Sequence, residues 1–236
     1  MPEHVSAHAA APAAANLRDL GGLRFERGGM TRSGVLYRSD CPTTDSQPGS
    51  GIPIWPPASV VDLRFDSEVG AFPTPWPNGV QRSHVPPYSQ DALQALPPGT
   101  SLGELYIHIL GSSSHGLVAA AVAAMSGEAP VLVHCRAGKD RTGLVIALLL
   151  LLAGVERDDV ITDYLRTGSN LRRIAARRLP AGDSDVLVQP QWHAAPVDAI
   201  ESALAWIDGH GGATALWLEH DGNADLVRNW RSRLEV

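Results

Sequence analysis

Apolar positions along the chain separate a region of short strands from a region of helices. Two runs rich in β-branched residues, at 58–63 and 131–135, predict buried strands. From Leu102 onward the apolar residues recur at helical spacing. This spacing predicts helices over 102–110, 115–125, 156–167, 170–179, 197–210 and 225–234. The unbroken apolar run from Leu144 to Ala153 is too long for an average strand and predicts a buried helix that ends at Gly154.

The first hundred residues have a different character. Residues 16–40 alternate turn glycines with short apolar pieces, which predicts small β elements, and residues 1–15 are alanine-rich, which predicts a disordered tail. Twelve of the 18 prolines lie between residues 41 and 98, so we expect loops there around the strand at 58–63. Together these patterns predict one α/β domain over residues 16–236, with a central, mostly parallel sheet and helices on both faces.

Composition narrows the class of protein. The formal net charge is −6, which argues against a general nucleic-acid or anionic-membrane binder. No apolar run approaches the ~20 residues needed to cross a bilayer, and no signal peptide is recognised, so we expect no integral membrane association. Two cysteines do not make a disulfide scaffold, so we expect a cytoplasmic protein; secretion without a signal stays open.

The segment HCRAGKDRTG, residues 134–143, carries the candidate chemistry. Cys135 lies between a predicted strand and a helix that should begin near Thr142, and Arg141 follows six positions later. We expect the backbone of Arg136, Ala137, Gly138, Lys139, Asp140 and Arg141 to curl into a cradle of N–H groups for an oxyanion such as phosphate. These positive groups favour the thiolate of Cys135, which would attack phosphorus and form a phosphocysteine. Arg141 would clamp two phosphate oxygens.

Neighbouring residues have supporting roles in this prediction. His134 would orient the loop, and the Thr142 hydroxyl would donate a hydrogen bond to the sulfur. The general acid is one of two aspartates: Asp62, after the first buried strand, is favoured over Asp140 in the loop, and a structural pairing of Asp62 with Arg64 or Arg38 stays open. Lys139 would add charge at the rim or be a solvated loop lysine. The arginines at 172, 173, 177 and 178 would form a solvated helix face or a phosphate-recruiting rim.

This motif resembles the cysteine-dependent protein tyrosine phosphatases, and GKDRTG resembles the bacterial PtpB-like tyrosine and lipid phosphatases. Similar segments follow in the same order: NLRDLGG (16–22), VLYRSD (35–40), VVDLRFDSEV (60–69) and DDVITDYLRTGSN (158–170). The resemblance implies that Asp163 anchors the loop or Arg141 from behind. It also implies a two-helix lid after the Asp-Tyr pair, but the stretch 171–196 is shorter and contains Pro180, Gly182 and Pro190.

The predicted function is hydrolysis of phosphate monoesters through a phosphocysteine intermediate, as a protein tyrosine phosphatase. Activity on phosphoserine/threonine in proteins and on phosphoinositides stays open. Two other classes compete: an idle module that only binds phosphorylated residues, and another cysteine-loop enzyme such as a sulfurtransferase or arsenate reductase. The nine histidines show no metal-binding spacing, so we expect no metal and no cofactor.

Overall fold

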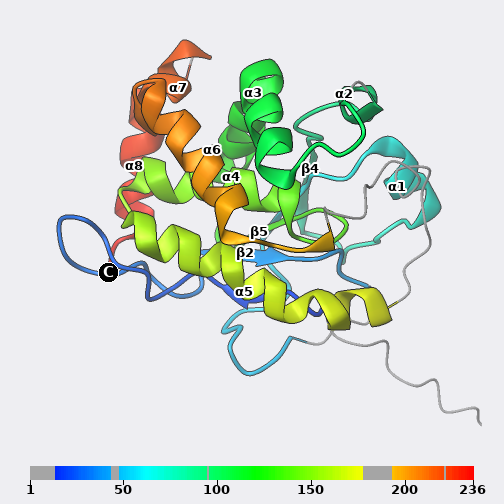
Figure 1. Cartoon of the computed structure of the whole chain (residues 1–236). Helices are drawn as coiled ribbons and strands as arrows, with labels where there is room; N and C mark the ends of the chain where they lie inside the picture. Colours follow the sequence, from blue (N-terminus) through cyan, green and yellow to red (C-terminus); the bar gives the residue numbers. More distant parts are fainter. Residues whose placement is uncertain (1–13, 44–47, 95, 178–192, 221) are drawn as a thin grey trace, which may run out of the picture.

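A computed structural model describes residues 14–43, 48–94, 96–177, 193–220 and 222–236. Five strands form one sheet in the order β1-β2-β5-β3-β4 (Figure 1). The strands are β1 (Arg18–Asp19), β2 (Leu36–Ser39), β3 (Ser59–Asp62), β4 (Gln81–His84) and β5 (Val131–His134). The helices are α1 (Asp66–Ala71), α2 (Asp91–Gln94), α3 (Leu102–Ser126), α4 (Asp140–Ala153), α5 (Arg157–Ala176), α6 (Val197–Gly209), α7 (Gly212–Glu219) and α8 (Ala224–Leu234).

The register of the parallel strands brings four chain segments to one edge. β2, β5, β3 and β4 are parallel, while β1 pairs antiparallel with β2. Ser39, Asp62 and His84 therefore end their strands level with His134. Ligand sites of open α/β sheets lie outside the carboxyl ends of the strands, so this edge is where a site is expected. The predicted α/β class and mostly parallel sheet are confirmed.

The two faces of the sheet are covered differently. One face carries Leu36, Val61, Val131 and Val133, which pack in the main core with apolar residues of α3 and α4. The other face carries Tyr37, Val60 and Leu132, which pack against irregular segments and include contacts with Trp55 and Trp76. Among the described residues, helices thus cover one face, and the expectation of helices on both faces is wrong. The proline-rich region supplies aromatic loops as the second cover.

Several predicted boundaries need correction. The expected pair of helices at 102–110 and 115–125 is one helix, α3, with a kink at Ser113 (φ −140°, ψ 20°). The Ser112 hydroxyl donates to the carbonyl of His108 within this continuous helix. α5 likewise runs unbroken through the expected gap at 168–169, and the side-chain amide of Asn170 donates to the carbonyl of Arg166 one turn earlier. Four elements were missed: α1, α2, β4 and α7. β4 is a mostly exposed polar edge strand without an apolar period.

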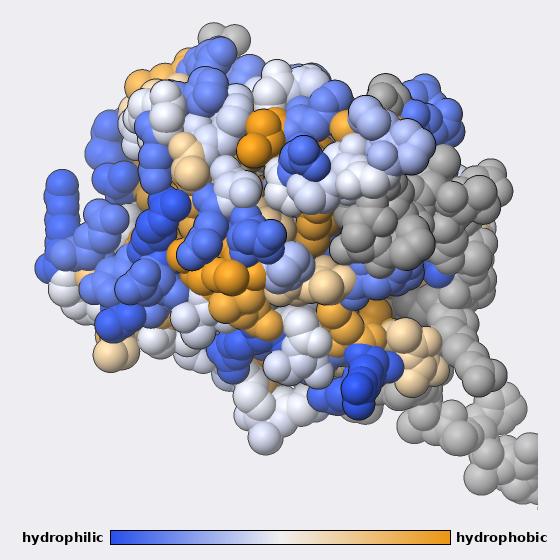
Figure 2. Space-filling model, viewed as in Figure 1, coloured by the Kyte–Doolittle hydropathy of each residue, from blue (hydrophilic) through white to orange (hydrophobic). Residues whose placement is uncertain are grey.

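Two predictions about the chain as a whole meet the structure only in part. Residues 1–13 of the expected tail lie outside the described residues, whereas Ala14 and Ala15 are buried. α3 is long and apolar enough to cross a membrane by length and composition, but a core helix passes the same test. It packs against α6, α4 and the sheet (Figure 1). Apolar side chains on the face drawn in Figure 2 gather in its middle, over α5, within a largely hydrophilic surface.

Candidate active site

Cys135 follows β5 directly and lies buried at the foot of a tight loop that leads into α4. The backbone N–H of Gly138 donates to its Sγ at 3.2 Å, so this amide points inward toward the sulfur. α4 begins at Asp140, two residues earlier than expected, with Lys139 as its N-cap. The positive end of the α4 dipole therefore lies at the loop itself.

The loop carbonyls point away from the sulfur, into the body of the protein. The carbonyl of Arg136 accepts from the backbone N–H of Cys41 (2.9 Å), and the carbonyls of Ala137 and Gly138 accept from Asn16 Nδ2 (3.5 and 3.0 Å). In a trans peptide the carbonyl and the following N–H point in opposite directions. The N–H groups that follow these carbonyls, those of Ala137, Gly138 and Lys139, are therefore turned toward the pocket; they are three of the six residues expected to form the cradle.

A buried ion network holds the loop from behind. Asp163 accepts from Arg18 Nε (2.7 Å) and from Arg38 Nη1 (2.5 Å), and Arg38 Nη2 donates to the carbonyl of Gly138 (2.7 Å). Of the two anchoring roles that the resemblance implied for Asp163, the structure shows the one through the loop. Asn16, Arg18 and Arg38 were missed as supporting residues, although all three lie in the segments 16–22 and 35–40.

Gly138 allows this loop to approach the strand edge closely. Its φ is +66°, a region that side chains disfavour, and a Cβ at this position would lie 2.3 Å from the carbonyl oxygen of Ser39. Both observations require glycine here.

Arg141 lies over the ring of Phe65, with its guanidinium carbon 4.3 Å from the ring centroid, and is held by Glu68. Its Nη1 donates to Glu68 Oε2 (2.5 Å) and to the carbonyl of Leu63 (3.1 Å), and its Nη2 donates to Glu68 Oε1 (2.8 Å). These contacts use three of the five guanidinium hydrogens and leave Nε and one Nη2 hydrogen as a fork for two oxygens.

Burial opposes the charge on both partners of this pair, but their mutual contacts outweigh it. They raise the pKa of Arg141 and lower the pKa of Glu68 below its ordinary value. The sequence reasoning missed Glu68. The available signal was an acidic residue three positions after Phe65, where its carboxylate also caps α1 by accepting from the Phe65 N–H (2.7 Å).

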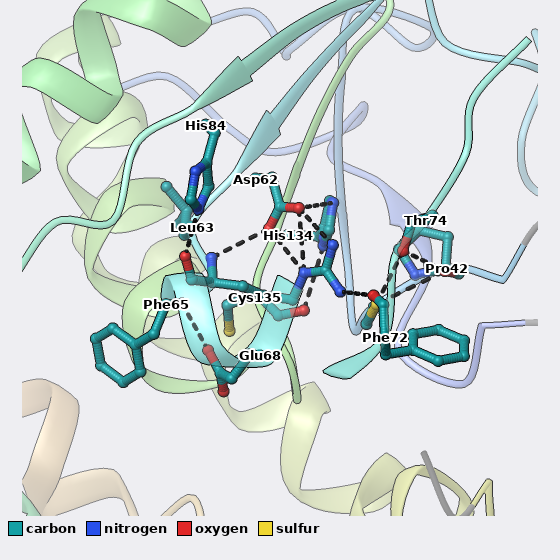
Figure 3. A network of polar contacts seen from close by, with 12 residues as sticks. Pro42, Asp62, Leu63, Phe65, Glu68, Phe72, Thr74, His84, His134 and Cys135 are labelled. Carbon is teal, nitrogen blue, oxygen red and sulfur yellow. Dashed lines mark hydrogen bonds and ion pairs between the residues drawn. The ribbon is translucent and has the colours of Figure 1, made fainter. Parts of the chain in front are cut away.

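Asp62 lies at the end of β3 beside His134 and forms a closed pair with Arg64 (Figure 3). Arg64 Nε donates to Oδ1 (2.9 Å), Nη2 donates to Oδ2 (2.6 Å), and the Arg64 N–H adds a third bond to Oδ1 (3.1 Å). Burial opposes ionisation of Asp62, but the neighbouring His134 and these bonds from Arg64 hold its pKa well below the ordinary value. Asp62 is not among the residues that line the pocket above Cys135. The geometry therefore favours the structural pairing with Arg64 over the general-acid role.

Asp140 does line that pocket. Its Oδ1 accepts from the Tyr106 hydroxyl (2.6 Å) and from Lys139 Nζ (2.5 Å). The Lys139 side chain is buried in this pair, so the expectation of a solvated loop lysine is wrong; Lys139 lines the pocket, with its charge paired to Asp140. Lys139 can be buried because its ammonium group is paired with the Asp140 carboxylate, and a buried ammonium is retained only with such a partner.

His134 and Thr142 are fully buried beside the nucleophile. The His134 Nδ1 contacts the carbonyl of Cys135 (3.3 Å), in keeping with a loop-orienting role, and burial lowers the pKa of its imidazole. The Thr142 hydroxyl has no hydrogen-bond partner among the described residues, so the expected bond to the sulfur is absent from this structure.

A pocket of about 460 Å³ opens above the loop. Cys135, Lys139, Asp140 and Arg141 form its floor, and apolar side chains form much of its wall; these include Phe65, Tyr88, Leu93, Leu105, Leu171 and Ile174. In the described part of the chain no group of three or more His, Cys, Asp or Glu residues could hold a metal ion.

The arginines at 172, 173 and 177 differ in their surroundings. Arg172 is exposed and lines the pocket, and Arg173 is exposed. Arg177, just after α5, has its side chain buried in an ion pair with Asp40, which is neither of the two expected roles. Arg178 lies outside the described residues, as does most of the stretch 171–196, where the resemblance implies a lid.

Comparison with known proteins agrees with this geometry. The model of a tyrosine phosphatase family matches residues 9–235. The chain belongs to the tyrosine phosphatase family. It is 46% identical over 56 residues to the triple specificity protein phosphatase PtpB of Mycobacterium tuberculosis, covering 24% of this chain and 20% of that protein. It is 34% identical over 160 residues to a tyrosine-protein phosphatase of Nostoc commune, covering 66% of this chain and 49% of that protein. The chain thus matches at most about half the length of these two relatives.

The predicted resemblance is confirmed for the family. The structure brings Cys135, the loop and Arg141 together at one pocket. The role of each residue still depends on the arrangement of its atoms, because relatives that match over part of their length do not carry residue roles by themselves.

Proposed function

We propose that this protein hydrolyses phosphate monoesters, with phosphotyrosine in proteins as its main substrate class. One observation carries the proposal: a buried cysteine lies under inward-turned amides, and Arg141 offers the free side of its guanidinium to the same space. Such a site stabilises the charge on the equatorial oxygens of a transferring phosphoryl group. Neither an idle binding module nor a sulfurtransferase needs this combination of nucleophile and clamp.

The reaction would proceed in two balanced steps. The Cys135 thiolate attacks phosphorus, the S–P bond forms, and the bond from phosphorus to the leaving oxygen breaks as that oxygen takes a proton from Asp140. Water then attacks the phosphocysteine, giving its proton to the Asp140 carboxylate. The S–P bond breaks, phosphate leaves and the thiolate is restored. We assign the general acid to Asp140 because it lines the pocket, whereas Asp62 is held by Arg64.

The pocket wall supports an aromatic substrate. Leu93, Leu105 and Ile174 offer apolar surface beside the charged floor, and the Phe65 and Tyr88 rings meet edge to face at 5.8 Å. A phenyl phosphate fits such a site, with its ring against the wall and its phosphate on the loop. The relative from Mycobacterium tuberculosis carries the name triple specificity. We therefore keep phosphoserine/threonine and phosphoinositides as additional substrates to be tested.

The test compares the wild-type protein with Cys135→Ser and with Cys41→Ser as the matched control. The wild type should release phosphate from para-nitrophenyl phosphate in the presence of EDTA, Cys135→Ser should lose activity, and Cys41→Ser should keep it. Trapping of a phosphorylated Cys135 by rapid acid quench would identify the intermediate. Loss of activity in EDTA, or an active Cys135→Ser, would contradict the proposal.

We also propose that residues 16–236 form the catalytic domain and that it works in the cytoplasm. Both described cysteines are free thiols, which suits a reducing compartment.

A further inference from the structure

Two donors converge on one oxygen of Asp140. The Tyr106 hydroxyl and Lys139 Nζ both bond Oδ1, at 2.6 and 2.5 Å. No hydrogen bond from a described residue is made to Oδ2, and Asp140 lines the pocket. An added proton therefore has an open place on Oδ2 and a crowded one on Oδ1.

A second tyrosine lies behind the first. The Tyr164 hydroxyl is 2.9 Å from the Tyr106 hydroxyl, and the two rings meet edge to face at 6.2 Å between centroids. A tyrosine has one hydroxyl hydrogen, and that of Tyr106 is used on Asp140. Tyr164 must therefore donate to the Tyr106 oxygen, which gives a directed chain from Tyr164 through Tyr106 to Oδ1.

The surroundings make this chain rigid. Both tyrosines are almost completely buried, and burial raises the pKa of each phenol, so both hydroxyls stay neutral donors near neutral pH. The Tyr164 ring packs on the backbone of α4 at Gly143, where a Cβ would lie 3.1 Å from Cδ2. The glycine that ends the loop motif thus makes room for the second tyrosine.

We propose that Tyr106 and Tyr164 are positioning residues for Asp140: their hydroxyl chain fixes Oδ1, so that the catalytic proton sits on Oδ2 facing the leaving oxygen. This rests on the proposed function. The proton moves from Oδ2 to the leaving oxygen as the S–P bond forms and the P–O bond breaks. The carboxylate left on Asp140 is stabilised by Tyr106 and Lys139, and water returns the proton to Oδ2 in the second step.

The experiment uses hydroxyl deletions that preserve the rings. Tyr106→Phe and Tyr164→Phe are compared with Tyr37→Phe, whose buried hydroxyl accepts from the Ile54 N–H on the other face of the sheet. Each variant is also made in an Asp140→Asn background. kcat and KM are measured for para-nitrophenyl phosphate, which has a good leaving group, and for phenyl phosphate, which has a poor one.

We expect Tyr106→Phe to slow kcat for phenyl phosphate about tenfold and to change kcat for para-nitrophenyl phosphate far less. Tyr164→Phe should give a smaller effect of the same kind, and Tyr37→Phe none. In the Asp140→Asn background neither tyrosine substitution should reduce the rate further, since the group that they position is gone. KM and inhibition by inorganic phosphate should stay within about twofold of the wild type.

Equal slowing of both substrates by Tyr106→Phe, or an undiminished effect in the Asp140→Asn background, would show a merely structural role and overturn the inference. The proposed function fails differently. If Asp140→Asn slows para-nitrophenyl phosphate and phenyl phosphate by the same factor, the assignment of the general acid is wrong. If Cys135→Ser remains active, the phosphatase mechanism is wrong.

Discussion

The ion pair between Glu68 and Arg141 predicts that Glu68→Gln lowers both the stability and the activity of the protein. Glu68 accepts from Arg141 through both carboxylate oxygens, and its Oε2 also accepts from the Phe65 N–H. The side-chain oxygen of a glutamine can replace Oε2, which accepts from both the Phe65 N–H and Arg141 Nη1. Its NH₂ group then takes the place of Oε1 and faces Arg141 Nη2. One charge-assisted hydrogen bond is lost, and a donor then faces a donor. Arg141 should swing away from the position in which its free side faces the pocket.

The magnitude follows from the burial of this pair. A hydrogen bond to a charged group contributes about 1.5–3 kcal/mol. We therefore expect Glu68→Gln to lower the free energy of unfolding by about 2 kcal/mol, and to lower kcat/KM about 30-fold if the same loss is felt in the transition state. Glu68→Ala removes both bonds and leaves a buried guanidinium unpaired, which costs about 3–5 kcal/mol in stability.

Asp66→Asn is the matched control, because it removes the same charge from the same helix at a side chain that is 96% exposed. Urea unfolding and para-nitrophenyl phosphate kinetics are measured for both variants. Asp66→Asn should stay near wild type. If Glu68→Gln and Asp66→Asn are indistinguishable in kcat/KM, Glu68 does not position Arg141 and the reasoning is refuted.

The pair also predicts a dependence of stability on pH. Arg141 lowers the pKa of Glu68 in the folded protein despite burial, so its contribution is fully present above the unfolded value of about 4.5. It is lost as the pH falls through the lower folded value. The difference in unfolding free energy between wild type and Glu68→Gln should therefore shrink below that pH. A difference that grows on acidification would contradict the sign of the shift.

Three more predictions follow from the same edge of the sheet. Asp62→Asn should lower stability by about 1.5–3 kcal/mol and slow para-nitrophenyl and phenyl phosphate equally; a selective effect on phenyl phosphate would return the acid role to Asp62. Gly138→Ala should lower stability by about 1–3 kcal/mol in thermal unfolding, because its Cβ would meet the Ser39 carbonyl at a positive φ; an unchanged melting temperature would contradict this. Burial raises the pKa of Cys41 to about 11, so its alkylation by iodoacetamide at pH 8 should be about 100-fold slower than that of a free thiol; equal rates would refute the shift.

The sequence was most informative where one short segment contains the whole feature. The loop at 134–143 combines strand end, nucleophile, glycine and arginine within ten residues, and its placement before α4 follows from local pattern alone. The family resemblance extended this to Asp163. Partners from elsewhere in the chain were harder to predict, because Glu68 and Tyr106 reach the loop through sheet register and helix packing. The role of Asp62 was ambiguous in the sequence for the same reason: a strand-end carboxylate near the site shows the same local pattern whether it is free or paired with Arg64.

Charge pairing determines which groups a protein with a net charge of −6 would use to bind the phosphate of the proposed substrate. Six cations near the loop have carboxylate partners: Arg141 with Glu68, Lys139 with Asp140, Arg64 with Asp62, Arg177 with Asp40, and Arg18 and Arg38 together with Asp163. Burial requires this pairing, since an isolated ion is costly to remove from water.

Attraction for the phosphate then comes mainly from short-range donors: the inward amides, the start of α4 and the free side of Arg141. Donors at contact distance inside a buried loop are screened little by salt. Competitive inhibition by inorganic phosphate should therefore weaken less between low and moderate salt than a site built on exposed lysines and arginines would. A steep loss of inhibition with salt would instead point to exposed cations such as Arg172 as the main source of affinity.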